Sequence, residues 1–496
     1  MELNKKRIRC FKKVYEAALS REETAESVVP DTQPDIAEIL DTDGMVMLRS
    51  KDSEPGRAGI SGSISATVLY RPEAGWGVKA LNVTMNFSVY AESAAITEES
   101  RLSATVRICA IEARMLNPRK VLIRAEVLVT LSCFEEGELE VFDGLEDAGD
   151  TQVLLASCRF SPVTDVREKT FVINEEFQMP ATKPVAGELL KQRVELVSEE
   201  VKSVGNRLIF KGAAQISLLY AASGDSPVSA LTFSAAFSQI LEMDEMSEQA
   251  DAEIRLMLTG AYFETHPDGR SLTCELHLVA QAIVSDNGEM SYIADAYSNT
   301  NELRLESEVM ETVSIERRQP LRETIRDTIE TSATVRDIIQ VYPVMGIAEV
   351  SGGRVRCPVT VTVIYSDDAD VIRSVRRSFT VESSVEIGPL MEAAVTEIRG
   401  AEAFASPAAG GLEFRMPVDI DLLITSRHRC SAITGIEVDE ESPVNTSQWP
   451  SVTVLMRRDG ADVWELAKRY RSTPELIEMA NSGEGDDNLL LIPRAR

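Results

Sequence analysis

Three carboxylates near the N-terminus have a spacing that could support chemistry. The segment "VVPDTQPDIAEIL", residues 28–40, contains Asp31, Asp35 and Glu38. Carboxylates gathered in this way could bind a cation, or could act as the acid and the base of a hydrolase. Alternatively, the segment marks the entry into a domain, and its structural residues should then recur wherever that domain recurs.

Three similar segments elsewhere in the chain favour the second explanation. "GSISATVLY", "GAAQISLLY" and "CPVTVTVIY" end at Tyr70, Tyr220 and Tyr365. Each alternates apolar with more polar residues and places its tyrosine on the apolar side, which is typical of a strand with one buried face. Each is followed further along by an X-Pro turn and a second alternating run. These runs begin at Ile123, Leu272 and Leu412. We therefore predict one β-domain in three copies.

The entry segment can be compared between the first two copies. Pro30 and Pro34 have counterparts 150 residues later (180 − 30 = 150), which is also the offset between the first two tyrosines. The carboxylates do not recur, because Asp31 aligns with an alanine and Asp35 with a valine. Proline fixes φ and biases the preceding residue towards extended geometry. We interpret the segment as structural, with the hydrolase as an alternative.

Composition narrows the classes of function. The 496 residues carry a net charge of −29, which disfavours nucleic acid and anionic membrane as partners. The seven cysteines are dispersed without a CxxC pair, so we expect thiols in a reducing compartment and no metal site. No motif of a nucleotide-binding loop, a serine-hydrolase elbow or a zinc protease is present, and we expect neither enzymatic activity nor a cofactor.

The N-terminal segment, residues 1–25, is basic and has no apolar core of the kind found in signal peptides. We expect it to form a solvated leader helix. No stretch approaches the about 18 apolar residues needed to span a bilayer, so a cytoplasmic location is expected.

The last 47 residues, 450–496, differ from the rest of the chain in their sequence pattern. "SVTVLM" predicts a short strand, and Asp462 followed by Glu465 forms a capping-box-like pair at the start of a helix. Thr473-Pro474 predicts the start of a second helix, and "NLLLIP" a closing strand. Residues 439–449, acidic and then rich in Pro, Asn and Ser, are predicted to be a linker.

The entry segment and the tyrosine-terminated strands resemble the SPOCS domain family of spore coat assembly proteins from endospore-forming bacteria. The resemblance assigns SPOCS-like domains to residues 26–165, 172–300 and 320–438. The family is not associated with catalysis. The expected fold is mainly β, with three tandem antiparallel β-sandwich-like SPOCS domains followed by a small βααβ domain.

The small domain, residues 450–496, resembles a LysM module through "DVWELAKRYRSTPELIEMAN" and "LLLIP". The family's Gly-Asp-Thr turn is replaced by Gly460-Ala461-Asp462, and its Pro-Gly turn by "GEGDDN". In LysM modules that bind glycans, both turns line the groove for N-acetylglucosamine. A site built from hydrogen-bonding groups loses affinity when those groups change. The departures therefore imply a module that binds protein, with peptidoglycan binding as the alternative.

The two resemblances together imply a scaffold in the mother cell of a sporulating bacterium, at the forespore surface. The LysM head would bind the ATPase that polymerises as the basement layer of the coat, and the SPOCS domains would engage other coat proteins or self-associate. Trp464 is either a core residue of the head or an exposed interface anchor. The candidate partner-binding residues are Trp464, Arg457, Arg458, Gly460, Asp462, Lys468 and Asn481.

Overall fold

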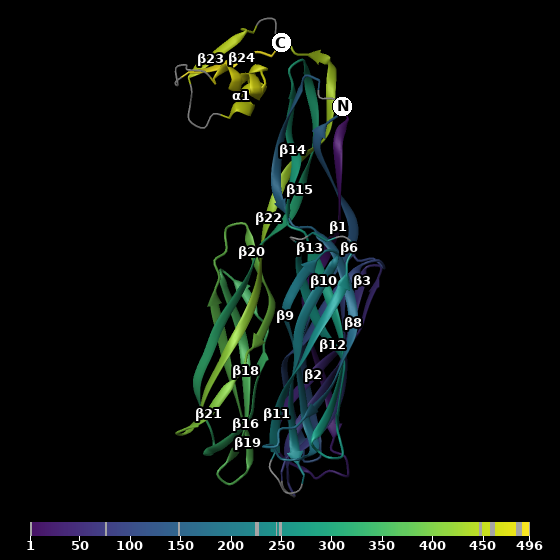
Figure 1. The fold of residues 1–496 in the computed structure, drawn as a ribbon, viewed down its shortest axis with the longest axis vertical. Helices are drawn as coiled ribbons and strands as arrows, with labels where there is room; N and C mark the ends of the chain where they lie inside the picture. Colours follow the sequence, from purple (N-terminus) through teal and green to yellow (C-terminus); the bar gives the residue numbers. More distant parts are fainter. Residues whose placement is uncertain are drawn as a thin grey trace.

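The computed structural model shows a mainly β chain, as the sequence predicts. It describes residues 2–495 except 75–76, 147–148, 224–227, 245, 248–249, 446–448, 457–461 and 483–488. Three β-sandwiches lie side by side, a stalk of long strands rises from them, and a small helix-containing head sits at the end of the stalk (Figure 1).

The three sandwiches share one strand order, and every pairing in them is antiparallel. The first has sheets β1–β6–β5 and β2–β3–β4, the second β8–β13–β12 and β9–β10–β11, and the third β15–β22–β20 and β16–β18–β19. The strands of the first are β1 (Leu3–Val28), β2 (Ile36–Glu54), β3 (Arg57–Pro72), β4 (Lys79–Glu92), β5 (Arg101–Asn117) and β6 (Lys120–Leu145). Those of the second are β8 (Val163–Gln178), β9 (Ala186–Val204), β10 (Arg207–Ala222), β11 (Val228–Glu242), β12 (Asp251–Thr265) and β13 (Ser271–Ser285). Those of the third are β15 (Asn301–Glu330), β16 (Val335–Met345), β17 (Glu349–Ser351), β18 (Arg354–Asp367), β19 (Ile372–Ser384), β20 (Met391–Gly400), β21 (Phe404–Ala408) and β22 (Gly411–Pro443).

The apolar residues of the predicted alternating strands are buried in the structure. Tyr70, Tyr220 and Tyr365 lie on the central strands β3, β10 and β18 and are at most 1% exposed. Their cross-strand partners, Ile39, Leu189 and Ile338, occupy equivalent positions of β2, β9 and β16. The second predicted runs form β6, β13 and β22, and their apolar residues fill the three cores. The equivalence of the three tyrosine-terminated strands is therefore confirmed.

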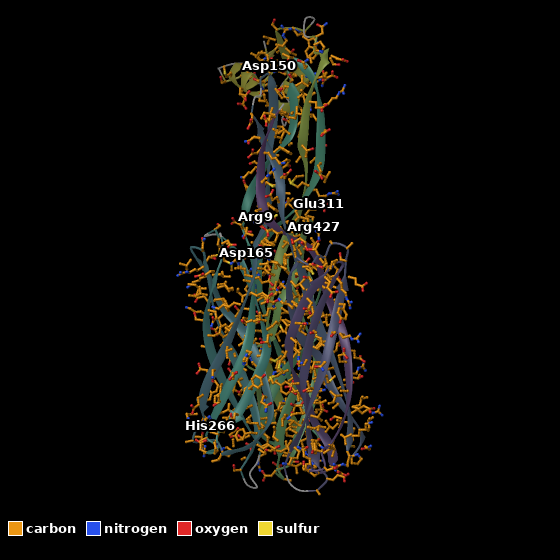
Figure 2. All side chains as sticks on the ribbon, turned by 90° about the vertical axis from the view of Figure 1, so that its right-hand side faces the viewer. Arg9, Asp150, Asp165, His266, Glu311 and Arg427 are labelled. Atoms are coloured by element: carbon orange, nitrogen blue, oxygen red, sulfur yellow. The ribbon has the colours of Figure 1, made fainter. Side chains whose placement is uncertain are left out.

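The stalk combines long strands that continue beyond the sandwiches with a separate pair of strands. β7 (Thr151–Phe160) pairs with β14 (Gly288–Ser298), and β15 pairs with β22 along almost its whole length. Figure 2 shows Arg9 of β1 near the junction between stalk and sandwiches and Asp150 close to the head. Because long strands run through both parts, the predicted domain boundaries at residues 26, 172, 320 and 438 fall inside β1, β8, β15 and β22.

The predicted leader helix is wrong. Residues Leu3–Val28 form β1, which pairs with β6 over its full length. Three cations of β1 face glutamates of β6: Lys5 lies 2.6 Å from Glu140, and Arg7 and Arg9 also contact acids of that strand. Opposite charges on facing strands stabilise a sheet, and this tertiary pairing overrides helix propensity.

The head has the predicted order of strand, helix, helix and strand. Its elements are β23 (Val452–Met456), α1 (Val463–Tyr470), α2 (Pro474–Ala480) and β24 (Leu489–Pro493). Asp462 caps α1 by accepting from the Trp464 backbone N–H at 2.9 Å, and Thr473 caps α2. Neither helix, in the part of the chain that the structure describes, has the length and apolar character needed to cross a membrane. The predicted linker begins later than expected, because β22 continues to Pro443.

Candidate functional site

The three entry carboxylates are held by two arginines and do not share a single partner. Arg119, in the turn between β5 and β6, contacts Asp35 at 2.5 Å and Asp31 at 3.1 Å, and also donates to the Val29 carbonyl. Glu38 pairs separately with Arg71. Among the described residues, no group of three or more His, Cys, Asp or Glu side chains is arranged to hold a metal ion.

The second sandwich shows what the entry segment requires. Arg270, in the equivalent turn, donates to the carbonyls of Lys183 and Pro180 where no carboxylate is present. The Tyr70 and Tyr220 hydroxyls donate to the carbonyl of the second proline of each entry segment, at 3.2 and 3.0 Å. An arginine and a tyrosine thus fix the proline segment in both copies. The sequence comparison missed the arginine because the second turn is one residue longer (270 − 119 = 151).

A buried polar cluster joins the three sandwiches at their common centre. Asp41 of β2 contacts the Lys191 ammonium of β9 at 2.8 Å and accepts from the Tyr342 hydroxyl of β16 at 2.7 Å. All three side chains are buried, and the ammonium lies 3.9 Å from the centre of the Tyr342 ring. Burial, together with the charges of Asp41 and Asp43, raises the pKa of Tyr342 well above its ordinary value. The phenol therefore stays a hydrogen-bond donor at physiological pH.

The cluster occupies equivalent positions in the three copies. By strand register, Asp41 corresponds to Lys191 and to Gln340, and Asp43 corresponds to Arg193 and to Tyr342. Arg193 contacts Asp43 at 3.1 Å and donates to the Pro343 carbonyl at 2.7 Å. Each copy therefore supplies a chemically different side chain at the same place.

An apolar layer lies beside this polar cluster. Equivalent bulges in β2, β9 and β16 place Leu40, Leu190 and Ile339 at the centre, where they pack together. The layer also contains the residues that precede the three tyrosines. These are Leu69, Leu219 and Ile364. An apolar residue directly before each tyrosine breaks the alternation, and this was the sequence signal for contact between the copies.

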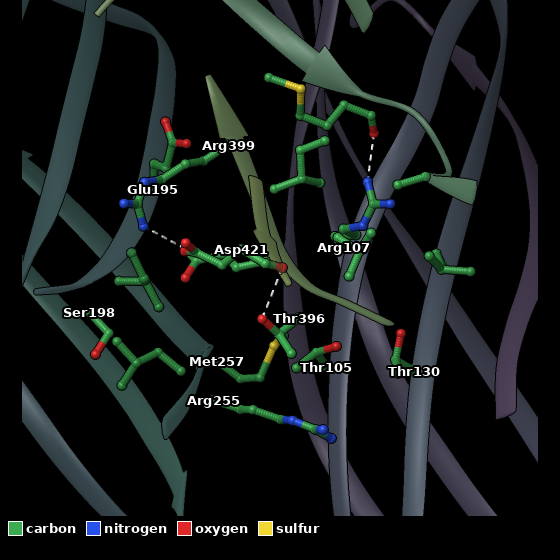
Figure 3. A pocket seen from close by; sticks show the side chains of 18 of the residues that line it. Thr105, Arg107, Thr130, Glu195, Ser198, Arg255, Met257, Thr396, Arg399 and Asp421 are labelled. Atoms are coloured by element: carbon green, nitrogen blue, oxygen red, sulfur yellow. Dashed lines mark hydrogen bonds and ion pairs between the residues drawn. The ribbon is translucent and has the colours of Figure 1, made fainter. Parts of the chain in front are cut away.

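A cavity of about 1090 Å³ lies between the three sandwiches, and its charged side chains are largely paired with one another (Figure 3). Arg399 contacts Glu397 at 3.1 Å, and Arg107 donates to the Met345 carbonyl of the third sandwich at 2.7 Å. Burial raises the pKa of Glu195 and of Glu397, with nearby arginines acting in the opposite direction. The Arg107 contact joins the first sandwich to the third, whereas Arg399 and Glu397 lie on the same strand, β20.

Trp464 is buried and contacts the stalk, so it does not serve as an exposed anchor. Its side chain is 7% exposed, and its indole Nε1–H donates to Asp295 of β14 at 2.8 Å. Its ring meets Tyr297 edge to face, with centroids 4.9 Å apart. Lys468, another predicted partner-binding residue, also contacts Asp295, at 2.6 Å. The exposed alternative for Trp464 is therefore not the arrangement in this structure.

Further contacts fix the head on the stalk. The Tyr297 hydroxyl donates to the Ser472 carbonyl at 2.9 Å, and Arg471 donates to the Ser298 carbonyl at 2.7 Å. The linker predicted at residues 439–449 does not separate the head from the stalk, because these contacts pack the two parts together. The stalk residues responsible lie in "ADAYS", far from the head in sequence, where alternation alone indicates only a strand.

Asp295 is expected to act as the latch between head and stalk. Burial tends to raise its pKa, but hydrogen bonds from Lys468 and Trp464 outweigh burial and the pKa is lowered. A carboxyl with a lowered pKa stabilises docking above its ordinary pKa of about 3.9. Docking should therefore persist at neutral pH and weaken as the pH falls below about 4. Asp295→Ala should release the head, shifting Trp464 fluorescence to longer wavelength in a Trp76→Phe/Trp449→Phe background.

Glu302→Ala provides the matched control for the latch. Glu302 is also a stalk acid that contacts the head, through Arg471, but its side chain is 58% exposed. Exposed ion pairs contribute little, so this variant should leave the emission unchanged. If Asp295→Ala and the parent chain had the same emission wavelength, the head alone would bury Trp464, and Asp295 would not act as the latch.

The other predicted partner-binding residues either hold the head together or lie outside the described residues. Asp462 caps α1, as described above. The Asn481 amide bridges α2 and β24, donating to the carbonyls of Ile477 and Leu491 and accepting from the Leu491 N–H at 2.8 Å. Arg457, Arg458, Gly460 and Ala461, and the turn at residues 483–488, lie outside the described residues.

The head exposes an apolar sheet face that the sequence analysis did not single out. β23 and β24 pair with each other, and alternate residues of both strands point away from the helices. We call this surface the hairpin face. It consists of Val452, Val454, Met456, Leu489 and Leu491, all exposed. Contiguous exposed apolar residues on a soluble domain are typical of protein-binding surfaces. The sequence does contain a signal for this face: every residue of "SVTVLM" and "LLLIP" is apolar except the serine and the threonine.

Comparison with known families gives one match, within the second sandwich. Residues 186–264 match the family model described as SipL, SPOCS domain. This match supports a SipL-like family and indicates a sporulation-related protein. No curated protein and no solved structure matches the chain.

The SPOCS match covers β9 to β12, and three of these strands, β9, β10 and β11, contribute residues to the central contact between sandwiches. The first and third sandwiches have the same strand order as the matched one. Lys191 and the bulge residue Leu190 lie within the match, so the SPOCS region of the second sandwich contributes directly to the buried centre.

Proposed function

We propose that the chain is a non-enzymatic scaffold in spore coat assembly, whose head links the basement-layer ATPase of the forespore surface to other coat proteins. The proposal combines the SPOCS match with the LysM-like sequence of the head. The observation that carries it is the hairpin face, whose exposed apolar residues lie on β23 and β24. Figure 1 shows these two strands in the head, at the far end of the stalk. The head would bind the ATPase, and the sandwiches would bind the other coat proteins.

The hairpin face suits a protein partner better than a sugar. Its five side chains are aliphatic or thioether groups, and Met456 is 77% exposed. Aliphatic side chains exclude water against a complementary protein surface, whereas a glycan requires hydrogen-bonding groups. Trp464 of α1 is covered by the stalk and offers no stacking surface in this arrangement. The contact area therefore lies on the sheet side of the head.

Val454→Asp is expected to weaken binding of the basement-layer ATPase at least tenfold, a loss of about 1.4 kcal/mol in binding free energy. Val454 lies in the middle of β23 and is 52% exposed, so an aspartate there leaves the core of the head intact but places a charge within the contact. Surface plasmon resonance with the purified ATPase measures the affinity, and far-UV circular dichroism checks the fold.

Val309→Asp is the matched control for the hairpin face. Val309 lies on β15 in the stalk and is 55% exposed, so the substitution and the exposure are nearly the same. It should bind the ATPase like the parent chain. Equal affinities for both variants would remove the hairpin face from the contact, and strong retention on purified peptidoglycan without ATPase binding would replace the scaffold by the glycan-binding alternative.

A further inference from the structure

Two thiols from different layers meet inside the stalk. Cys158 lies on β7 and Cys430 on β22, 272 positions apart (430 − 158 = 272). The Cys158 sulfur lies 3.9 Å from the Thr312 hydroxyl of β15. Met310, the cross-strand partner of Cys430, lies two residues from Thr312 on β15, so Thr312 and Met310 share one face of that strand. Neither thiol has a role in the head–stalk latch or in the hairpin face.

Strand register shows what a bond between these thiols would join. Cys158 is paired with Met290 of β14, and Cys430 is paired with Met310 of β15. The pair β7–β14 forms one sheet, and β15–β22 belongs to another. A covalent bond would therefore fasten the two sheets of the stalk face to face, beside β14, the strand that also carries the latch residue Asp295.

We propose that Cys158 and Cys430 form a reversible disulfide that fastens the two sheets of the stalk when the chain meets an oxidised low-molecular-weight disulfide. The Cys158 thiolate attacks one sulfur of the small disulfide, forming a mixed disulfide and releasing one small thiolate. The Cys430 thiolate then attacks the Cys158 sulfur and releases the second. The two protein thiols are oxidised, the small disulfide is reduced to two thiols, and these take up the two protons.

The surroundings set the order and the speed of these steps. All seven cysteines are described, and Cys158 alone is partly exposed, so it is the thiol that an external disulfide reaches first. Burial, followed by the hydrogen bond with Cys430, raises the pKa of Cys158 to about 11. Only the thiolate attacks a disulfide, so the reaction should be slow at pH 7. Its rate should increase about tenfold for each unit by which the pH rises, as long as the pH stays below that pKa.

Peptide mapping of the full-length chain tests the proposal. The protein is incubated with oxidised glutathione at pH 8.5, then denatured and alkylated. We expect a crosslinked peptide pair containing Cys158 and Cys430, and a fall from seven free thiols to five (7 − 2 = 5). Dithiothreitol should restore seven, and repeating the oxidation at pH 7.5 should slow it about tenfold.

Serine variants make the test specific. Cys430→Ser should stop at a glutathione adduct on Cys158, whereas Cys133→Ser, which removes a fully buried thiol of the first sandwich, should still form the crosslink. A stable glutathione adduct on Cys158 in the parent chain, with Cys430 still free, would overturn the proposal. A crosslink that involves any other pair of cysteines would do the same.

Discussion

Replacing Lys191 by methionine is expected to lower the free energy of unfolding by about 4 kcal/mol. The ammonium is 1% exposed and lies 2.8 Å from the Asp41 carboxylate, which is itself buried. Without the ammonium, Asp41 keeps the Tyr342 hydroxyl and a longer ion pair with the Arg376 guanidinium, at 3.7 Å, whose side chain is partly exposed. A buried charge whose partner has been removed destabilises the folded state far more than the intact pair stabilises it.

Gln340→Met is the matched control for this prediction. Gln340 occupies the position of Lys191 in the third sandwich, and among the described residues neither of its amide atoms has a hydrogen-bond partner. Both substitutions give a methionine of similar length at equivalent places. Because Gln340→Met removes an unsatisfied buried amide, it should leave stability unchanged or raise it.

Urea unfolding followed by circular dichroism measures both variants, using the first cooperative transition because the chain has several cores. The double variant Asp41→Leu/Lys191→Met should recover most of the loss, since it leaves no unpaired charge at this pair. If Lys191→Met were as stable as Gln340→Met, the prediction would be contradicted. Water would then reach the cluster and solvate the Asp41 carboxylate.

The strands of the three sandwiches could be predicted because their signal is local. Side chains alternate between the two faces of a strand, so Ile64, Ala66 and Val68 reveal the buried face before Tyr70 without knowledge of any neighbour. The arrangement of the copies depends instead on outward-facing residues. Leu69 is buried only because Leu219 and Ile364 meet it from the other sandwiches. Its counterparts lie about 150 and 295 residues away (219 − 69 = 150, 364 − 69 = 295), which no local pattern encodes.

The two errors at the ends of the chain have the same physical cause. The segment around Arg7 forms a strand because Glu138 and Glu140 of β6 face it, more than 130 residues later. Trp464 is covered because Asp295 and Tyr297 of the stalk meet it. In both places a distant partner decides between alternatives that the local sequence leaves open.

The three copies differ in chemistry at the buried polar positions where they touch. The tyrosines are identical in all three, whereas the equivalent central positions carry aspartate, lysine and glutamine. Three identical copies would place three like charges, or three uncharged amides, at one buried point. The charge difference therefore fixes which sandwich neighbours which, and it explains why a repeat of one domain forms a single asymmetric assembly.

Gly62→Ala and Gly212→Ala are each expected to destabilise the chain by about 3 kcal/mol. Gly62 faces Phe87 across β3 and β4, and Gly212 faces Phe237 in the same way in the second sandwich. A β-carbon on Gly62 would lie 2.5 Å from the Met47 carbonyl oxygen and closer still to the Phe87 ring, and one on Gly212 would lie 2.7 Å from the Phe237 ring. The phenyl rings occupy the space of the missing side chains, so an alanine overpacks the core.

The third sandwich shows how far this loss can be reversed. Its equivalent pair is Cys357 and Val381. The cysteine is larger than the glycine it replaces, and the valine that faces it is smaller than the phenylalanine. Cys357 fits there because the neighbouring strand is interrupted between β16 and β17, whereas β2 passes Gly62 without a break. Gly62→Ala/Phe87→Val should therefore recover only the part of the loss that comes from the ring. Gly288→Ala, where a β-carbon meets nothing within 4 Å, should leave the urea midpoint unchanged, and a similar midpoint for Gly62→Ala would show that β3 can move away from its neighbours.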